Sequence, residues 1–323
     1  MKKFISTKMK IFMALLASIS IGCYIAAAIV LYNSDFKLAN YIDEIDGHFN
    51  RMDNGFNMHM GWRDWNDSNS FGTIEKDFPT SIENLNVNSS SADIDIQFYE
   101  GSTIKVDISG NFYSNYSYED GLRSFDISNN LVTIDTNEGN RCSSLNVKIY
   151  IPSIYKGNVN LTTQSGDLNI IGGDLAKINL STHSGDIDIS NLISQDLTIN
   201  ATSADIYASN TNSTKSNIMT SSGDIDIIGS LGDTKVGSSS GEVSLSLNSL
   251  GKTSNFSSTS GTIYLNIDKT IGYNLSFSTS SGELNGFGSN RNSGNRNNHT
   301  ITNGDGSNAI TVSTTSGDLE INN

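Results

Sequence analysis

The feature that most constrains the fold is a short unit that recurs along the chain. Its pattern is a Ser-Gly-Asp step followed by alternating aliphatic residues, as in "SSGDIDI" at 221–227. The nine copies have their Gly or Ala at positions 92, 166, 185, 204, 223, 241, 261, 282 and 317. From 166 to 282 the spacings are 19, 19, 19, 18, 20 and 21 residues. A fixed period near 20 residues is the signature of a repeat architecture.

The columns of this alignment predict strands on both sides of the Gly or Ala. A branched aliphatic residue always stands two places after it, and an apolar residue always stands five places before it. Polar residues alternate with these, which is typical of a strand with one buried face. Parallel stacking would place identical columns over one another. An antiparallel meander with Ser-Gly hairpins would not explain the small residue three places before the Gly. We therefore predict an all-β parallel β-helix, or solenoid, of about 19-residue repeats.

The Ser-Gly step predicts a tight corner within each copy. Ser always precedes the Gly or Ala, and Ser, Thr or Ala always stands three places before it. We expect the hydroxyls of this second column to lie inside the corner and to bond to one another and to turn amides. Gly is expected to supply backbone freedom, although Ala92 and Ala204 indicate that a positive φ is not required everywhere.

The N-terminal residues predict a membrane anchor. Lysines 2, 3, 8 and 10 precede Ile11–Tyr32, a run of 22 uncharged residues that is long enough to span a bilayer as a helix. The positive-inside rule places residues 1–10 in the cytoplasm and the rest of the chain outside it. We expect a single-pass protein of the cell membrane. A cleaved signal peptide and a lipoprotein modified at Cys23 are the alternatives.

The rest of the chain divides into a juxtamembrane linker or cap at 33–80 and a β-strand-repeat domain at 81–323. The 74 residues between Ala92 and Gly166 fit degenerate rungs or a hairpin insertion. A Gly- and Asn-rich loop at 286–309 precedes the last copy. The strand that ends near Asn323 is expected to leave an open edge, so end-to-end self-association is predicted.

The charge of the chain excludes one class of partner. Residues 1–32 hold 4 of the 20 basic residues and none of the 34 acidic ones, so the remainder has a net charge of −18. Such a domain is not expected to bind nucleic acid. Cationic peptides, envelope proteins and glycans remain candidate partners.

An acidic column provides the one candidate metal site. The position after the Gly or Ala is acidic in every copy except the one with Thr262. In a parallel stack these carboxylates would form an exposed ladder. Turn capping by the aspartates is the favoured interpretation. The alternative is weak Ca²⁺ binding by Asp167, Asp186, Asp205 and Asp224, although the glycine-rich calcium repeat of β-rolls is absent.

Catalysis and cofactor binding are not expected. The acidic residues form a repeated column, whereas polysaccharide-cleaving β-solenoids need a singular set of carboxylates in a groove. The four histidines are scattered, and His183 occupies an outward place in its copy. No P-loop, dinucleotide fingerprint or Cys/His cluster is present.

The order of the motifs resembles one bacterial family. "VKIYIP" at 147–152, the serial Ser-Gly-Asp units and the late glycine loop are similar to the putative-adhesin β-strand-repeat family, or domain of unknown function 4097. The resemblance covers about residues 81–323. It implies a parallel β-helix, surface or membrane association, and for some relatives a link to envelope stress and antimicrobial-peptide responses. It supplies no catalytic residues.

These observations lead to one functional hypothesis and two alternatives. The first is a non-enzymatic, membrane-anchored extracytoplasmic protein that presents an adhesin-like binding surface. The second is a regulatory or sensor component of an envelope-stress or antimicrobial-peptide response. A carbohydrate-active β-helix enzyme is the third and least favoured.

Overall fold

The computed structural model describes residues 68–113, 124–128, 131–136, 142–286 and 297–322. These residues form strands and turns only. The predicted cytoplasmic segment 1–10, the predicted membrane helix 11–32 and most of the predicted linker lie outside them. Among the residues described, none belongs to a helix with the length and apolar character needed to cross a bilayer.

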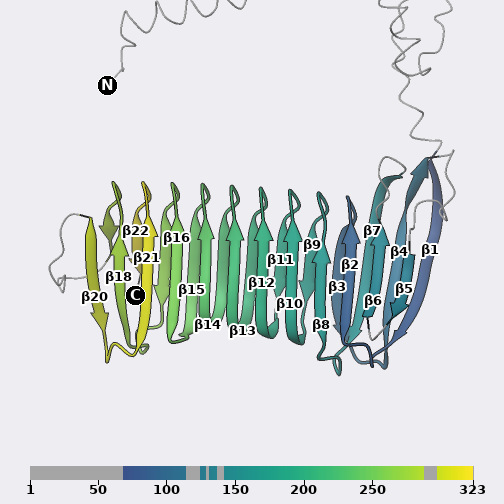
Figure 1. The fold of residues 1–323 in the computed structure, drawn as a ribbon, viewed down its shortest axis with the longest axis horizontal. Coiled ribbons are helices and arrows are strands. Elements are labelled where there is room, and N and C mark those ends of the chain that lie inside the picture. Colours follow the sequence, from purple (N-terminus) through teal and green to yellow (C-terminus); the bar gives the residue numbers. More distant parts are fainter. Residues whose placement is uncertain (1–67, 114–123, 129–130, 137–141, 287–296, 323) are drawn as a thin grey trace, which may run out of the picture. The chain divides into compact units, whose positions relative to one another are not determined.

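Each copy of the repeat forms one rung of two strands joined at the Ser-Gly corner (Figure 1). The strands before the corner stack into one layer, here called the pre-corner layer. Its strands are β2 (Asn84–Ser89), β8 (Asn158–Thr162), β10 (Asp174–Thr182), β12 (Ile193–Ala201), β16 (Thr253–Ser258), β18 (Tyr273–Ser278) and β21 (Asn308–Thr314).

The strands after the corner stack into a second layer, here called the post-corner layer. Its strands are β3 (Asp93–Tyr99), β9 (Leu168–Ile171), β11 (Ile187–Ser190), β15 (Val243–Leu250), β17 (Ile263–Ile267), β19 (Leu284–Asn285) and β22 (Leu319–Asn322). Two long strands, β13 (Ile206–Thr220) and β14 (Ile225–Ser238), run through both layers.

Neighbouring rungs pair in parallel and in the register of the repeat. Ile187, Ile206 and Ile225 lie directly beside one another in the post-corner layer. Leu180, Ile199 and Ile218 do the same in the pre-corner layer. These columns are buried in one continuous hydrophobic core between the layers. The prediction of an all-β fold with parallel stacked repeats is confirmed, because same-column aliphatic residues can bury their area only in this register.

At the N-terminal end, the rung of Ala92 stacks directly on the rung of Gly166. Thus β2 pairs with β8, and β3 pairs with β9. The intervening chain folds back outside this rung, where β6 (Leu131–Thr136) and β7 (Cys142–Pro152) pair in parallel with β2 and β3. Antiparallel strands β1 (Ser68–Pro79), β4 (Thr103–Tyr113) and β5 (Ser124–Ser128) complete this end. The gap between copies therefore contains both a degenerate rung and hairpins.

At the C-terminal end, the last copy in the sequence is not the last rung in space. Strand β21 pairs in parallel with both β16 and β18, and β22 pairs with both β17 and β19. The rung of Gly317 is thus inserted between those of Gly261 and Gly282. Strand β20 (Asn298–Asn303) then pairs antiparallel with β18 and lies outermost (Figure 1). The prediction of an open edge near Asn323 is wrong, so end-to-end self-association loses the strand on which it was based.

Candidate functional site

The small residues of the corner have a structural role. In seven copies, the hydroxyl three places before the Gly or Ala accepts its backbone N–H at 2.7–3.3 Å. These hydroxyls are buried. Thr220 and Ser238 also donate to the carbonyl oxygens of Ala204 and Gly223 in the preceding rung, at 3.2 and 3.0 Å. The expected bonds to turn amides are confirmed in these seven corners.

The acidic column that follows the corner forms a hydrogen-bonded ladder. One oxygen, Oδ1, of each Asp accepts the backbone N–H of the acidic residue in the next rung at 2.7–3.0 Å. The acceptors are Asp93, Asp167, Asp186, Asp205 and Asp224, and the donors are Asp167, Asp186, Asp205, Asp224 and Glu242. Asp318 accepts the N–H of Glu283 at 2.7 Å in the same way. All four candidate calcium ligands therefore satisfy backbone donors that belong to the rung interface.

The carboxylates beside this ladder repel one another. Asp188 lies two residues beyond Asp186 on the post-corner layer. Its pKa is raised by desolvation and by the nearby charges of Asp186 and Asp167. The pKa of Tyr264 is also raised, first by the charge of Glu242 and then by its partial desolvation and by Glu320. Together these groups make a negative stripe along the post-corner layer, which attracts cations in general.

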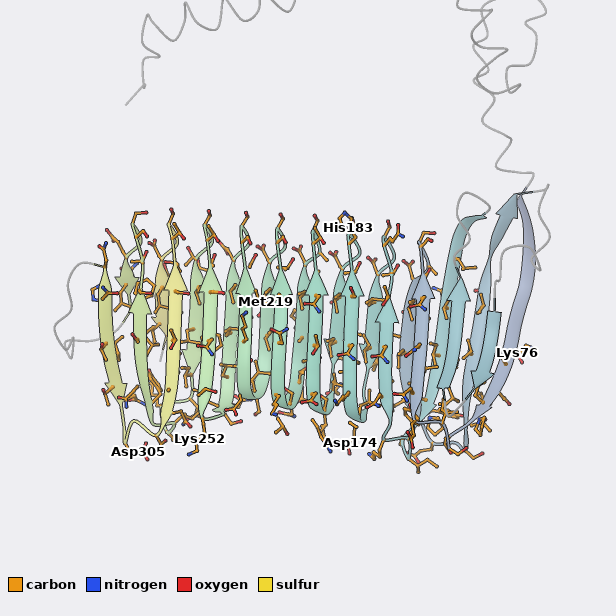
Figure 2. The ribbon with its side chains drawn as sticks, in the orientation of Figure 1. Lys76, Asp174, His183, Met219, Lys252 and Asp305 are labelled. Carbon is orange, nitrogen blue, oxygen red and sulfur yellow. The ribbon has the colours of Figure 1, made fainter. Side chains whose placement is uncertain are left out.

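The described residues contain no cluster of three or more His, Cys, Asp or Glu side chains suited to a metal ion. His183 is exposed at the corner end of its rung, whereas Asp174 and Lys252 lie at the opposite end (Figure 2). The ring of His299 stacks on Phe277, with ring centroids 6.1 Å apart. The histidines His48 and His59 lie outside the described residues.

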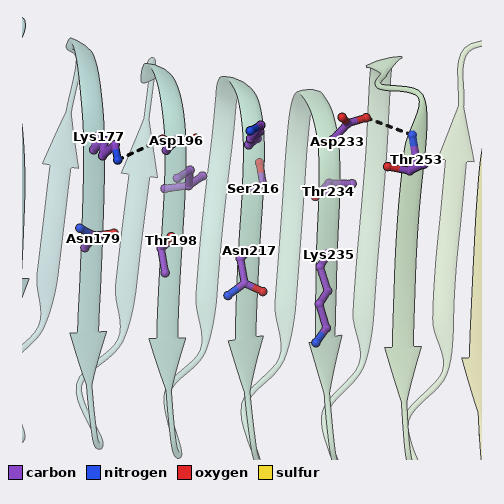
Figure 3. Close-up of a pocket in the computed structure, with 12 residues that line it drawn as sticks. Lys177, Asn179, Asp196, Thr198, Ser216, Asn217, Asp233, Thr234, Lys235 and Thr253 are labelled. Atoms are coloured by element: carbon purple, nitrogen blue, oxygen red, sulfur yellow. Dashed lines mark hydrogen bonds and ion pairs between the residues drawn. The ribbon is translucent and has the colours of Figure 1, made fainter.

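The outward side of the pre-corner layer carries a shallow groove across β10, β12, β13, β14 and β16, of about 480 Å³. Two rows of side chains run across it, one residue from each rung (Figure 3). The first row is Lys177, Asp196, Lys215, Asp233 and Thr253. The second row is Asn179, Thr198, Asn217 and Lys235. Ammonium, carboxylate, amide and hydroxyl groups thus face solvent at rung spacing, about 4.8 Å.

The charged groups of the groove are only partly paired. Lys177 Nζ lies 3.6 Å from Asp196 Oδ2. Asp233 Oδ1 accepts the backbone N–H of Thr253 at 3.1 Å. Lys215 and Lys235 are exposed, and within the described part of the chain neither lies within ion-pair distance of a carboxylate. The groove therefore carries three lysines and two aspartates, a local net charge of +1, on a domain whose net charge is strongly negative.

A buried column beneath the groove departs from the repeat. Seven places before the corner Gly or Ala, the inward residue is aliphatic in six rungs, whose residues are Leu85, Val159, Ile178, Leu197, Leu275 and Ile310. In three successive rungs it is Ser216, Thr234 and Ser254, of which the first two line the groove. Ser216 shares a hydrogen bond with Ser213. Thr234 Oγ1 and Ser254 Oγ have no hydrogen-bond partner among the described residues.

Sequence reasoning did not single out this groove. The columns nearest the corner drew attention because they repeat, whereas the lysines of the groove occupy variable positions. The detectable signal was the interruption of an aliphatic column by three hydroxyl residues. In a repeat protein such an interruption is easy to detect. The other rungs show that core packing at this position favours an aliphatic residue, so a hydroxyl residue there is a departure from the pattern.

These features define a class of protein: an all-β repeat protein that exposes two broad outward faces, one acidic and one with mixed charge and amides. The Toastrack DUF4097 family model matches residues 82–322. The chain belongs to this family, and the resemblance stated from its motifs is confirmed.

Several solved structures are similar to the chain at low identity. A "putative lipid binding protein" from Parabacteroides distasonis ATCC 8503 is 16% identical, covers 78% of this chain and 97% of its own, and has a TM-score of 0.48. A "putative adhesin" from Parabacteroides merdae ATCC 43184 is 13% identical, with coverages of 78% and 97% and a TM-score of 0.47. A "putative adhesin" from Bacteroides fragilis NCTC 9343 is 11% identical, with coverages of 77% and 97% and a TM-score of 0.45. No curated protein matches the chain.

Proposed function

We propose that this chain is a non-enzymatic, membrane-anchored extracytoplasmic protein that uses its β-repeat domain as an adhesin-like binding surface at the cell envelope. The observation that carries the proposal is the outward side of the pre-corner layer. There, amide, hydroxyl and charged side chains recur at rung spacing around a groove. A rigid parallel stack holds these groups at fixed distances, which suits an extended polar ligand with a repeat of its own.

The absence of catalysis is part of this proposal. In the acidic ladder, the side chains of Asp93, Asp167, Asp186, Asp205 and Asp224 each hold a backbone N–H of the next rung. A carboxylate that holds a rung interface in this way is not free to be positioned on a substrate as a general acid. A carbohydrate-active enzyme would need carboxylates that make no such structural hydrogen bond and can contact the substrate.

The membrane anchor is proposed from residues 1–32 alone, where lysines precede the apolar run. Protease treatment of intact cells that express the full chain tests the topology. We expect the β-domain to be cleaved from outside while an epitope tag fused before Met1 stays protected. Protection of both parts would contradict the extracytoplasmic location.

The binding role is tested with the purified full chain in detergent, immobilised through an N-terminal tag. We expect saturable binding to cell-envelope polysaccharides or to an array of glycans, with no release of sugar fragments during long incubation. Fragment release would favour the enzyme interpretation. Absence of binding to isolated envelopes and to every glycan would contradict the adhesin-like role.

A second candidate function, a sensor of cationic peptides in an envelope-stress response, is favoured by the negative stripe on the post-corner layer. The raised pKa of Asp188, caused by desolvation and then by the charges of Asp186 and Asp167, indicates a surface that a cation would stabilise. A fluorescent cationic peptide should bind the full chain at low salt and dissociate at high salt. No binding at low salt would remove the basis for this function.

A further inference from the structure

We propose that the pre-corner groove binds an acidic sugar unit of a glycan, with its carboxylate or phosphate between Lys215 and Lys235 and its hydroxyls on the neighbouring amides and hydroxyls. This inference rests on the proposed function, because it names the ligand class of the same surface.

The positive charges of the groove identify the acidic part of the ligand. Lys177 and Asp233 already have partners inside the protein, whereas Lys215 and Lys235 have no ion pair among the described residues. In the register of β13 and β14, Asn217 is the direct neighbour of Lys235, and Lys215 stands two residues before Asn217. An anion bound at this point would meet two ammonium groups and the Asn217 amide, beside the Asp233 carboxylate, whose Oδ1 accepts the N–H of Thr253. Charge-assisted hydrogen bonds of this kind are the strong ones.

The remaining groups of the groove identify the polar part of the ligand. Asn179, Thr198 and Asn217 form a row of donors and acceptors without any large apolar side chain. Such a row suits a hydroxyl-rich ligand and offers little to an apolar one. Five rungs contribute to the groove, which corresponds to about 19 Å at the usual strand spacing. The ligand is therefore extended, and a free anion would fill only part of the groove.

The buried hydroxyls beneath the groove are a second feature that sets these strands apart from the rest of the repeat. Thr234 lines the groove, is only 4% exposed and has no partner for Oγ1. A buried hydroxyl without a hydrogen bond destabilises a fold, and six other rungs place an aliphatic residue in the same column. Residues that break a local rule in this way are expected at functional sites. Their side chains point into the core, so they mark the strands that carry the groove and do not themselves contact a ligand in it.

A nucleic acid would also offer phosphates, but the strongly negative domain around the groove repels a long polyanion. A glycan with acidic units spaced by neutral ones fits better, because Asp196 and Asp233 flank Lys215 in its row. The alternating charges would discriminate against densely charged polymers.

The test measures binding of defined probes to the full chain in detergent by isothermal titration calorimetry. The probes are a mixed oligosaccharide with separated glucuronate units, a glycan of equal length that carries phosphate monoesters at the same spacing, and the uncharged parent oligosaccharide. The groove variant is Lys215→Gln with Lys235→Gln. The matched control is Lys148→Gln with Lys269→Gln, which removes the same charge at exposed positions outside the groove.

We expect the unaltered chain and the control to bind one acidic probe, and the groove variant to bind it at least about tenfold more weakly. The acidic probe that binds with the higher affinity shows whether the acidic group of the ligand is a carboxylate or a phosphate. Equal losses in the groove variant and the control would overturn the groove assignment. Binding of the neutral parent as tightly as the acidic probes would overturn the acidic ligand class while leaving the adhesin-like role intact. Absence of binding to all three probes would also overturn the inference. In that case, binding of the chain to isolated envelopes would still support the proposed adhesin-like function, and absence of that binding would contradict it.

Discussion

At the scale of single residues, the short distance between neighbouring rungs explains why glycine occupies the corner position. A Cβ at Gly223 would lie 1.7 Å from the carbonyl oxygen of Ala204, and one at Gly185 would lie 1.9 Å from that of Gly166. None of the corner glycines is among the described residues with positive φ. The expectation that Gly supplies backbone freedom is therefore wrong at these corners. The close approach of the preceding rung excludes a side chain.

The first prediction concerns this contact. Gly223→Ala should lower the free energy of unfolding by about 1–3 kcal/mol, because the added methyl must push two backbones apart. The natural Ala92 and Ala204 indicate that a rung can adjust, which limits the loss. The shift of the urea midpoint of the full chain measures the effect. The control is Ser222→Ala at the adjacent exposed position, which should change stability by less than about 0.5 kcal/mol. Equal midpoints for the two variants would contradict the steric explanation.

The second prediction compares one substitution at two buried threonines. Thr182 Oγ1 accepts the N–H of Gly185 at 3.0 Å, whereas Thr234 Oγ1 has no partner. Thr182→Val should destabilise the domain by about 1–3 kcal/mol, and Thr234→Val should stabilise it by about 1 kcal/mol. Urea midpoints give both signs. Destabilisation by both variants would mean that Thr234 has a hydrogen-bond partner in solution.

At the scale of strands and ladders, most of the architecture could be predicted from the sequence. Alternation on both sides of Gly223 gave the strands, and the uniform columns gave the parallel register in which Ile206 and Ile225 pair. The polar ladder was also accessible, because an acidic residue follows nearly every corner. The groove was not, since its lysines carry no periodic signal and only the interruption at Ser216, Thr234 and Ser254 marks it.

The third prediction follows from charge repulsion along the post-corner layer. Because the pKa of Asp188 is raised in the folded state by desolvation and by Asp186 and Asp167, the folded chain holds this proton more tightly than the unfolded chain does. Stability should therefore fall as pH rises from the ordinary Asp pKa through the raised one. Asp188→Asn should remove this slope and stabilise the domain above it by a few tenths of a kcal/mol, since the group is largely exposed.

Urea midpoints measured from pH 3.5 to 7 at low and high salt check this effect. The difference between Asp188→Asn and the unaltered chain should shrink at high salt, because exposed charges are screened. Asp196→Asn, on the other layer, should instead cost a few tenths of a kcal/mol, because Asp196 is paired with Lys177. A steeper pH dependence in Asp188→Asn would contradict the assigned direction of the pKa shift.

At the scale of the whole β-domain, the order of rungs in space differs from their order in the sequence at both ends. The copy at Ala92 lies inside β6 and β7, and the copy at Gly317 lies inside β18 and β19. No local pattern in the sequence encodes this order, because every rung offers the same aliphatic columns to its neighbours. The spatial order of the rungs depends on the path that the chain takes between two copies. Antiparallel strands such as β20 then cover the edges of the outermost rungs.

The last prediction tests the inserted rung. Deleting residues 308–323 removes β21, which pairs with both β16 and β18, and β22, which pairs with both β17 and β19. The rung of Gly282, formed by β18 and β19, and the strand β20 that pairs with it should then detach from the rest of the stack, although none of their residues is deleted. Amide hydrogen exchange should show lost protection at Leu275, Phe277 and Ile301. Protection in β9–β12 should persist, because rungs in a repeat protein depend mainly on their neighbours. A chain stacked in sequence order would instead keep β18 and β20 protected, since only its outermost rung would have been removed.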